Sequence, residues 1–532
     1  MTFAQNHLPA SLVATMLWTA VACSSTETSA TAEPESTPVP SPEEPCPSAA
    51  WPSLGVVDAR VDVETAQRYL DWRTQREQDR LLEELEPAKL QAALRIEQRD
   101  LARGCYSLDE VVDLGRLLFL RDYTKAEGHG HDDKLYRFHT GRFGGPDATS
   151  CQSCHWKGGE VGAGDRVDNA YLFGDGDDVT TADLRNPVPL WGAGWMELVA
   201  SEMSQELAAQ ADALLQEADA TGARVEKELV AKGVSFGRLA ASLSANGQLD
   251  LDTSAVLGVD SDLVVKPFGW KGTYRTLREI VGASLQLHLG LQPEEVVEAP
   301  AAFGVAVGEA APADPDGDGV EREFTAGQVS ALVLYLATQD APPFLVPEEG
   351  VFRPYELYSQ ELEFIRSPEY VQVWTEGYSL FRTTGCATCH VPFLPVEQTL
   401  YRTKPAADTV DLVVDIATEG AKPVPPQDDE GRYLVAAFSD FKRHDLGAGL
   451  KSLHDDRGVP VQQWFTRPLW GLSQSSPYLH QGDAMVVDDA IARHGGEGEE
   501  AKLAFLRLST AEKEKFRFFL ASLARAPRVR VR

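Results

Sequence analysis

The sequence predicts a mainly α-helical protein that contains two copies of one helical module. Helix-start signals and helical spacing of apolar residues recur along the chain, whereas the alternation typical of strands is scarce. The pattern Cys-X-X-Cys-His occurs twice, at 151–155 and at 386–390. The chain has 532 residues, several times the usual length of a domain, so two or three packed units are expected.

The internal repeat extends beyond the two motifs. Each half has a Gly-x-x-x-Phe segment, then the motif, then a Pro-Leu-Trp-Gly segment: GRLLF, CQSCH and NPVPLWGAG in the first half, and GYSLF, CATCH and TRPLWGLS in the second. Because the order is the same, we expect two modules that carry different insertions. We place a helical N-terminal extension and the first module in residues 53–345, and the second module in residues 346–532.

Individual helices are predicted from caps and breakers. Residues 63–103 are rich in Ala, Leu, Gln, Glu and Arg but are interrupted by Pro87, which predicts two helices. Ser107 and Glu110 form a capping-box signature before the next helix. Further helices are expected at 196–231, 274–289, 325–338 and 368–382, and after a second capping box, Ser509 with Glu512.

The amino-terminal residues 1–23 contain an apolar run that is too short to cross a bilayer comfortably, which is typical of an export signal. The run ends in AVAC and resembles a lipobox, so Cys23 is predicted to carry a lipid. Residues 24–52 are rich in Ser, Thr, Pro and Glu and predict a disordered tether. We therefore expect an exported protein of the periplasm or cell envelope that meets the membrane only through its lipid anchor.

The formal net charge of the chain is −32. Such a charge repels the phosphates of nucleic acids and of anionic lipids, so nucleic-acid binding is excluded as a function. A basic or neutral partner is more compatible with this charge.

The chain has seven cysteines. Four lie in the paired motifs and a fifth is Cys23, which leaves Cys46 and Cys105. In an oxidising compartment, two remaining cysteines predict a disulfide, which would pin the end of the tether to the first folded segment.

Three chemistries use a Cys-X-X-Cys pair: a zinc site, a redox dithiol and covalently bound haem. Only the third needs a histidine directly after the second cysteine. In haem c the two sulfurs bind the vinyl groups and the adjacent imidazole ligates the iron. The sequence therefore predicts two haem c groups in two cytochrome c-like domains, held by Cys151, Cys154 and His155 in the first and by Cys386, Cys389 and His390 in the second.

The second axial ligand decides what each haem can do. A haem ligated on both faces mainly passes electrons, whereas one with an open face can bind peroxide or dioxygen. Beyond the signal, thioether candidates are limited to Met196, Met203 and Met485. The histidine candidates are His129, His131, His139, His288, His444, His454, His480 and His494. The motifs around His444 and His480 make these two the favoured catalytic candidates.

Taken in order, the motifs resemble the bacterial di-haem oxidoreductase family, which includes peroxidase-type and thiol oxidoreductase-like proteins and is distantly related to di-haem cytochrome c peroxidase. The stretches that carry the resemblance are SCQSCHWKGG, PLWGAGWMELV, KPFGWKGTYRTLREIV, GCATCHVP, FSDFKRHDLGAGL, FTRPLWGL, PYLHQGDA and AIARHGGEGEEA. The resemblance implies two facing cytochrome c-like domains, one with an electron-transfer haem and one with a substrate haem. It also implies electron relay through aromatic side chains, for which the candidates are Trp156, Trp191 and Trp470.

The chain departs from the family pattern at two places. Leu446 follows Asp445 where the family often has Met, so this position offers no thioether. HQGD at 480–483 stands where His-Asp-Gly-Arg is usual, which replaces an acid and removes a positive charge. Haem attachment is untouched, but both changes bear on the acid–base and charge-stabilising groups that peroxidase chemistry needs.

The segment DPDGDGVEREFT has the alternating acidic residues of a calcium loop, at Asp314, Asp316 and Asp318. Its twelfth position is Thr325 and not Glu, so Glu321 or Glu323 would have to complete the site. The alternatives are a calcium ion held here and a solvated acidic turn.

The leading hypothesis is an exported di-haem c oxidoreductase. It would take electrons from a redox protein or a small donor and reduce a small oxidant such as hydrogen peroxide. The first alternative is a non-catalytic electron-transfer protein with both irons six-coordinate. The second is a haem oxygenase acting on an organic substrate, as in the related di-haem rubber oxygenases.

Overall fold

The fold is known from a computed structural model. The described residues are 46–49, 51, 94–130, 147–173, 178–244, 246–298, 319–342, 347–348, 351–352, 368–405, 411–421 and 424–525. All of them belong to one compact unit, Cys46–Arg532. The predicted signal peptide, Cys23, nearly all of the tether and residues 314–318 lie outside the described residues. The module boundary at 345/346 stays a prediction.

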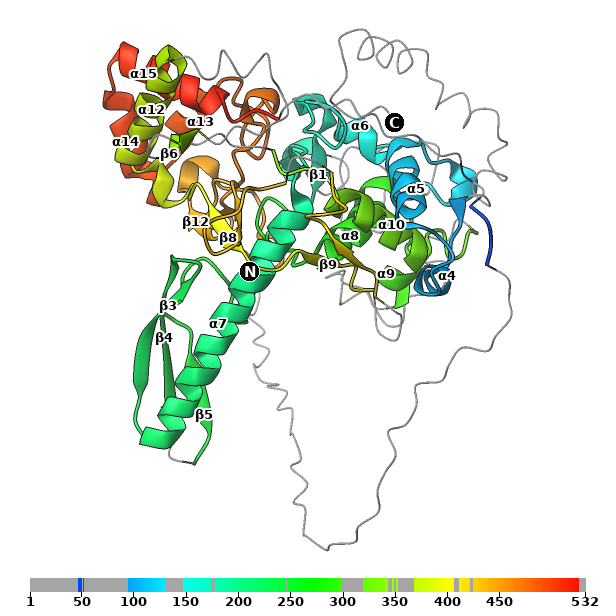
Figure 1. The fold of residues 1–532 in the computed structure, drawn as a ribbon, viewed down its shortest axis with the longest axis horizontal. Coiled ribbons are helices and arrows are strands. Elements are labelled where there is room, and N and C mark those ends of the chain that lie inside the picture. Colours follow the sequence, from blue (N-terminus) through cyan, green and yellow to red (C-terminus); the bar gives the residue numbers. More distant parts are fainter. Residues whose placement is uncertain are drawn as a thin grey trace, which may run out of the picture. The chain divides into compact units, whose positions relative to one another are not determined.

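The described part of the chain is mostly helical and has small sheets, as the sequence predicts (Figure 1). The helices are α4 (Gln98–Ala102), α5 (Leu108–Leu120), α6 (Cys151–Cys154), α7 (Ala193–Thr221), α8 (Leu277–Leu289), α9 (Glu294–Glu298), α10 (Ala326–Ala337), α12 (Pro368–Thr383), α13 (Val487–Arg493), α14 (Glu499–Arg507) and α15 (Thr510–Ala521). Among short 3₁₀ turns, η5 (Cys386–Thr388) and η8 (Gly496–Gly498) matter for the site.

The strands pair antiparallel. A three-stranded sheet has the order β3 (Val225–Ala231), β4 (Val234–Leu243) and β5 (Leu249–Asp252). The two-stranded pairs are β1 (Ala170–Leu172) with β2 (Asp183–Arg185), β6 (Pro347–Glu348) with β7 (Val351–Phe352), β8 (Leu394–Val396) with β11 (Tyr433–Val435), β9 (Leu400–Arg402) with β10 (Val413–Asp415), and β12 (Arg443–Asp445) with β13 (Gln463–Phe465).

The predicted helix at 196–231 is wrong at its end, because α7 stops at Thr221 and residues 225–231 form β3. Gly222 adopts a left-handed conformation (φ 64°) and terminates the helix. A two-residue turn at Lys232 and Gly233, both with positive φ, then folds β4 back onto β3. The helix-forming residues of β3 follow this turn and the buried face of the sheet, not their own propensity.

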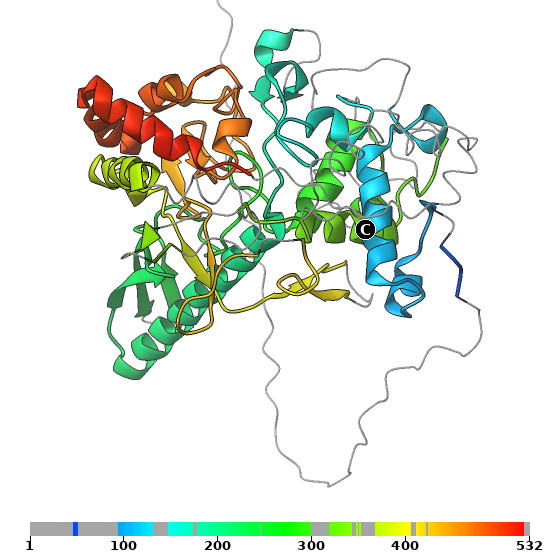
Figure 2. The same cartoon turned by 45° about the horizontal axis from the view of Figure 1, so that its top comes forward.

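The helix α7 and the sheet β3–β4–β5 lie side by side in both views (Figures 1 and 2). Leu207 and Leu214 of the helix and Phe236 and Leu239 of the sheet belong to one buried cluster. Although α7 has 29 residues, no helix among the described residues, α7 included, is long and apolar enough to cross a membrane.

The two modules share one helix crossing. A Cβ atom added to Gly115 of α5 would collide with the carbonyl oxygen of Ala331 in α10, and one added to Gly377 of α12 would collide with that of Lys515 in α15. Glycine is therefore needed at each crossing, because only a residue without Cβ lets the backbones approach this closely. Figure 1 shows both pairs, α5 with α10 and α12 with α15.

The equivalence of the helix pairs continues into their caps. Both α10 and α15 begin with a complete capping box, at Thr325 and Ser509. In each helix the residue that faces the glycine of the partner helix is the sixth after this cap: Ala331 in α10 and Lys515 in α15. Four residues after each glycine stands a buried phenylalanine. Phe119 packs against Tyr335, with ring centroids 5.5 Å apart, and Phe381 against Phe519, with centroids 5.2 Å apart.

The repeated Trp-Gly pairs pack against each other. Gly192 and Gly471 both have left-handed backbones, with φ of 65° and 67°. A Cβ on Gly192 would lie 2.7 Å from Trp470, and one on Gly471 would collide with the ring of Trp191. Each glycine thus makes room for the tryptophan of the other repeat. The two sequence repeats therefore meet reciprocally at these four residues.

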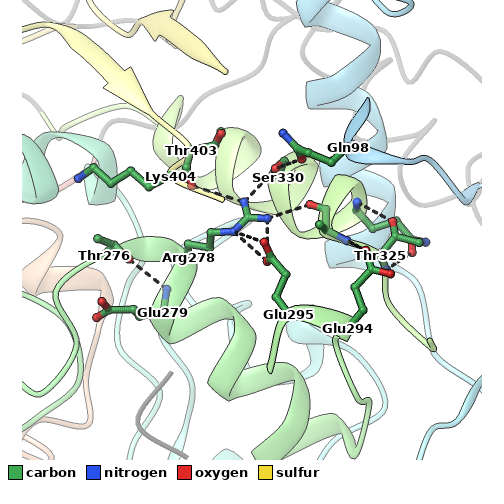
Figure 3. Close-up of polar contacts among 12 residues, drawn as sticks. Gln98, Thr276, Arg278, Glu279, Glu294, Glu295, Thr325, Ser330, Thr403 and Lys404 are labelled. Atoms are coloured by element: carbon green, nitrogen blue, oxygen red, sulfur yellow. Dashed lines mark hydrogen bonds and ion pairs between the residues drawn. The ribbon is translucent and has the colours of Figure 1, made fainter. Parts of the chain in front are cut away.

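The first module contains an insertion, the segment from α7 to α9. Arg278 of α8 anchors this insertion to the rest of the module (Figure 3). Its guanidinium pairs with Glu295 at 2.7 Å, and the two side chains are only 3% and 5% exposed. It also donates to the hydroxyl of Ser330 at 2.9 Å and to the carbonyls of Ala326 and Thr403 at 3.0 and 3.4 Å. One buried cation therefore ties α8, α9, α10 and the segment after β9 together.

Two further links join distant parts of the unit. A disulfide connects Cys46 and Cys105, whose Cα atoms are 5.2 Å apart. Near the other end, Arg525 pairs with the buried Asp340 at 2.6 Å and donates to the carbonyl of Glu160 at 3.0 Å. The end of the second module is thereby tied to residues on both sides of the insertion in the first.

Candidate haem sites

The second motif lies on the short turn η5, directly after α12. Gly385 has φ of 90° and turns the chain, and the amide of His390 then donates to the carbonyl of Cys386 at 2.9 Å. The sulfurs of Cys386 and Cys389 are not bonded to each other. The local fold thus presents two thiols and an imidazole from a single turn.

A cavity of about 880 Å³ adjoins this turn. This volume is within the range of small-molecule and cofactor sites. Its wall is formed by aromatic and aliphatic side chains and a few polar groups. Among the residues of the wall are Cys386, Cys389, His390, His444, Trp464, Arg467, Trp470, His480, Ala490, Ile491, His494 and Glu497. The cavity has room for a flat apolar group with polar substituents.

The imidazole of His390 is held in one orientation. Its Nδ1 lies 2.9 Å from the carbonyl oxygen of Phe438, so Nδ1 carries the proton and Nε2 keeps its lone pair. Burial lowers the pKa of His390 to about 4. The ring is therefore neutral near pH 7 and chemically ready to ligate a metal.

The first motif is built in the same way. Ser150 caps α6 by accepting the amide of Ser153 at 3.2 Å. The Nδ1 of His155 lies 3.0 Å from the carbonyl of Val188 and 3.2 Å from that of Gly162, and burial lowers its pKa to about 4. Both motif histidines thus offer Nε2 as the ligating atom.

The structure argues against the two other uses of the cysteines. Burial raises the pKa of Cys151 to about 12 and also raises that of Cys386, whereas a redox dithiol needs a depressed thiol pKa. In the part of the chain that is described, one group of three or more potential ligands comes together, and it contains a single cysteine, Cys389. The four motif cysteines do not gather into a zinc site. Paired thiols, a neutral imidazole and an adjoining cavity fit haem c.

His444, a predicted catalytic candidate, lies on the cavity wall with both ring nitrogens occupied. Nε2 is 2.7 Å from Asp440 and Nδ1 is 2.8 Å from Glu497. Burial alone would lower the pKa of His444, but the hydrogen bond and charge of Asp440, together with Cys389, raise it to about 11. A thioether sulfur is uncharged, so in haem c the part of this increase that Cys389 contributes would be lost, and the part from Asp440 would remain. His444 is an imidazolium fixed between two carboxylates.

His480, the other candidate, lies at the Trp464 side of the cavity. Its ring stacks on Trp464 with centroids 3.9 Å apart, and Nε2 is buried without a hydrogen-bond partner among the described residues. Burial and the nearby cations Arg185 and Lys271 lower its pKa to about 3. His480 is therefore a neutral imidazole with one unused nitrogen.

Arg467 is a functional residue that the sequence did not single out. It lines the cavity and makes a long hydrogen bond of 3.4 Å to the carbonyl of Gly269. Among the described residues no carboxylate pairs with it, and burial lowers its pKa to about 10. A partly buried cation that faces a cavity is stabilised by an anion. The carboxylates of haem would supply one.

The remaining predicted residues have mixed outcomes. Trp156 is 45% exposed, whereas Trp191 and Trp470 are buried, and each lies against the glycine of the other repeat, Gly471 and Gly192. Glu323 is buried and accepts the amide of Gln292 at 2.7 Å. Its three proposed partners in the acidic loop lie outside the described residues, so the calcium site stays a prediction.

Comparison with protein families matches residues 365–523 to the family described as di-haem oxidoreductase, putative peroxidase. These residues contain the second motif and most of the cavity wall. Over these residues, which are less than half of the chain, the protein is similar to the di-haem oxidoreductase family, the class that the paired motifs resemble.

A cytochrome-c peroxidase, IdrP2 from Pseudomonas sp. (strain SCT), is 29% identical over 162 residues, which are 28% of this chain and 39% of that protein. The chain therefore matches well under half of that relative. Two solved structures are similar at low scores. A MauG-like protein associated with microbial copper homeostasis has a TM-score of 0.25 and 15% identity, over 54% of this chain and 79% of that one. Hydrazine synthase of Kuenenia stuttgartiensis has a TM-score of 0.21 and 16% identity, over 37% and 56%. Scores of this size do not by themselves establish a shared fold.

Proposed function

We propose that the protein is an exported di-haem c oxidoreductase built from two cytochrome c-like domains. It takes electrons at one haem and reduces a small oxidant, such as hydrogen peroxide, at the other. The observation that carries the proposal is the pair of motifs in which His155 and His390 each hold Nδ1 against a backbone carbonyl and so present Nε2. Reducing one peroxide takes two electrons and two protons and yields two waters, so a protein with two one-electron centres suits the reaction.

Different residues of the chain would have different roles in this function. Bound haem would supply the one-electron chemistry. His155 and His390 would orient each group, and the motif cysteines would attach it. Arg467 would neutralise a carboxylate of the second group. His480 would hold a water by a hydrogen bond with its unused nitrogen.

Electron relay between the two sites is proposed for Trp191 and Trp470. The support is their burial and their position at the point where the two repeats meet, where each tryptophan lies against the glycine of the other repeat. Packing alone is the alternative role. Trp191→Phe should slow electron transfer between the haems in stopped-flow reduction while leaving haem content unchanged, and equal rates would assign the tryptophan to packing.

Export and lipid anchoring at Cys23 are proposed from the sequence. In cells, the full chain should fractionate with membranes, and Cys23→Ser should release it into the soluble exported fraction. The electron donor is proposed to be a basic or neutral redox protein or a small molecule, since the net charge is −32. A rate of reduction that falls as salt rises would support a basic protein donor.

The experiment that tests the proposed function is peroxide turnover by the purified, haem-loaded full chain with a reduced donor. Oxidation of two donor electrons per peroxide is expected. No turnover, combined with an absorption spectrum that peroxide leaves unchanged, would contradict the peroxidase and favour the electron-transfer alternative. Oxygen-dependent cleavage of an organic substrate would instead favour the oxygenase.

A further inference from the structure

The cavity beside the second motif contains three histidines besides His390, namely His444, His480 and His494. None of the three methionines considered as thioether donors lines it, and Met485 is 64% exposed. Of the histidine and methionine candidates among the described residues, only these histidines line the cavity and could supply a second axial ligand for a haem at this motif.

Two of the three are unsuited to that role. His444 has both nitrogens bonded to carboxylates, so it has no lone pair to offer. The ring of His480 stacks on Trp464, with centroids 3.9 Å apart, whereas the turn after His494 is tied to the second motif, because Glu497 pairs with His444, whose other partner, Asp440, donates its amide to the carbonyl of Cys389. His480 therefore belongs to the Trp464 side of the cavity and His494 to the neighbourhood of His390.

His494 is held for ligation in the same way as the two motif histidines. It follows α13 as the C-cap residue, and its Nδ1 lies 2.8 Å from the carbonyl oxygen of Ala490, one helical turn earlier. Because a carbonyl can only accept, Nδ1 carries the proton and Nε2 keeps its lone pair. The apolar side chains of Ala490 and Ile491 line the same cavity.

The turn after His494 is fixed to the second motif by a chain of contacts. Gly496 has φ of 52°, and a Cβ there would collide with the carbonyl of Asp445. Glu497 accepts the amide of Asp445 at 2.9 Å and pairs with His444. His444 in turn pairs with Asp440, whose amide donates to the carbonyl of Cys389 at 2.8 Å. The imidazolium thus braces the His494 turn against the motif.

We propose that Nε2 of His494 is the distal ligand of the haem attached at Cys386 and Cys389, and that Glu497 and His444 are positioning residues for it. The inference rests on the proposed function, since it assumes haem c at the second motif. A haem ligated by two histidines passes electrons, which leaves binding of the oxidant to the site at the first motif.

The test uses the haem-loaded full chain and three variants: His494→Ala, His494→Met, and His454→Gln as a control whose side chain is 42% exposed and does not line the cavity. Haem content, the EPR spectrum and a redox titration are measured for each. The alanine variant should convert about half of the haem to high spin while both haems stay attached. The methionine variant should restore low spin and raise one midpoint potential, because axial methionine stabilises reduced iron. The control should match the unmodified protein.

The inference is overturned if His494→Ala keeps both haems and leaves both spin states and both potentials unchanged. If His494→Ala loses haem, the redox titration of His494→Met is the deciding measurement. Two midpoint potentials equal to those of the unmodified protein would also overturn the inference. Glu497→Gln should give a mixture of spin states at the second haem if it positions His494, and an unchanged spectrum would remove that role. Peroxide turnover is measured separately. Absence of turnover would contradict the proposed function, but it would not affect the assignment of His494 as a ligand, which the EPR spectra and potentials test.

Discussion

The two modules share the same helix crossing, but different kinds of side chain pack around it. Both cross two helices at a glycine, cap the second helix with a capping box and place a phenylalanine four residues after the glycine. The second module surrounds this crossing with an aromatic cluster: Trp374, Phe381, Phe438, Phe505, Phe516 and Phe519. In the first module two ionic pairs contact the crossing helices: Arg278 with Glu295, which is buried, and Arg116 with Glu160, which is partly buried.

The difference shows which features a repeat keeps and which it can change. Glycines at a helix crossing and residues that bind the cofactor are set by geometry, so both modules have them. The side chains that pack around these residues depend on which further segments each module contains. The first module carries the insertion from α7 to α9, and directional ionic contacts connect it. Around its own helix crossing the second module packs mainly apolar side chains, and its buried ionic group, His444 with Asp440, lies at the cavity.

The largest effect should come from removing either cysteine pair. Replacing Cys151 and Cys154 with Ala, or Cys386 and Cys389 with Ala, should each lower covalent haem from two per chain to one, because each pair attaches its own group. Cys105→Ala is the control and should keep both haems. Covalent haem is measured after acid extraction. Loss of both haems from one double variant would show that the modules are not independent.

Next in size is the ionic centre of the first module. Arg278→Met should lower the free energy of unfolding by about 3–5 kcal/mol, because it leaves Glu295 buried without its cation. Arg275→Met, just before α8, is the control: its side chain is 62% exposed in its pair with Glu279, so a change within about 1 kcal/mol is expected. Urea unfolding measures both. Equal effects would refute the importance of burial.

The shared helix crossing should respond alike in both modules. Gly115→Ala and Gly377→Ala should each cost about 1–3 kcal/mol, because the added methyl group forces the two backbones apart. Gly449→Ala is the control, since a Cβ there meets nothing within 4 Å. Unfolding by urea is again the measurement. A cost at one crossing and none at the other would contradict their equivalence.

The smallest effect is the pH dependence that Glu160 adds to the first module. Burial raises the pKa of Glu160, but Arg116, Tyr335 and Arg525 outweigh burial and hold it below the usual 4.5. A carboxyl group with a depressed pKa stabilises the fold above about pH 4.5, and this contribution is lost as the pH falls through the lower, folded value. The unmodified protein should therefore be more stable than Glu160→Gln near pH 7, with thermal midpoints that converge in acid. A constant difference would contradict this assignment.

Much of the fold was predictable because it is local. The capping boxes at Ser107 and Ser509 do start helices, and the motif residues lie on turns suited to haem attachment. The strand β3 was not predictable, because its residues favour a helix and only the turn at Lys232 and the packing against α7 make it a strand. Arg467 was missed for a related reason, since a cation without a partner is visible only in three dimensions.

The sequence by itself determined the two haem-binding motifs, the repeat order and most helices, since spacing along the chain fixes which atoms share a turn. Only the tertiary structure decided the roles of the histidines. His444, His480 and His494 are all plausible in the sequence, and they differ in the groups that meet their ring nitrogens. Those groups come from distant segments or from the backbone, as with Glu497 for His444 and the Ala490 carbonyl for His494. A lone pair is available or occupied according to such contacts, and spacing along the chain does not encode them.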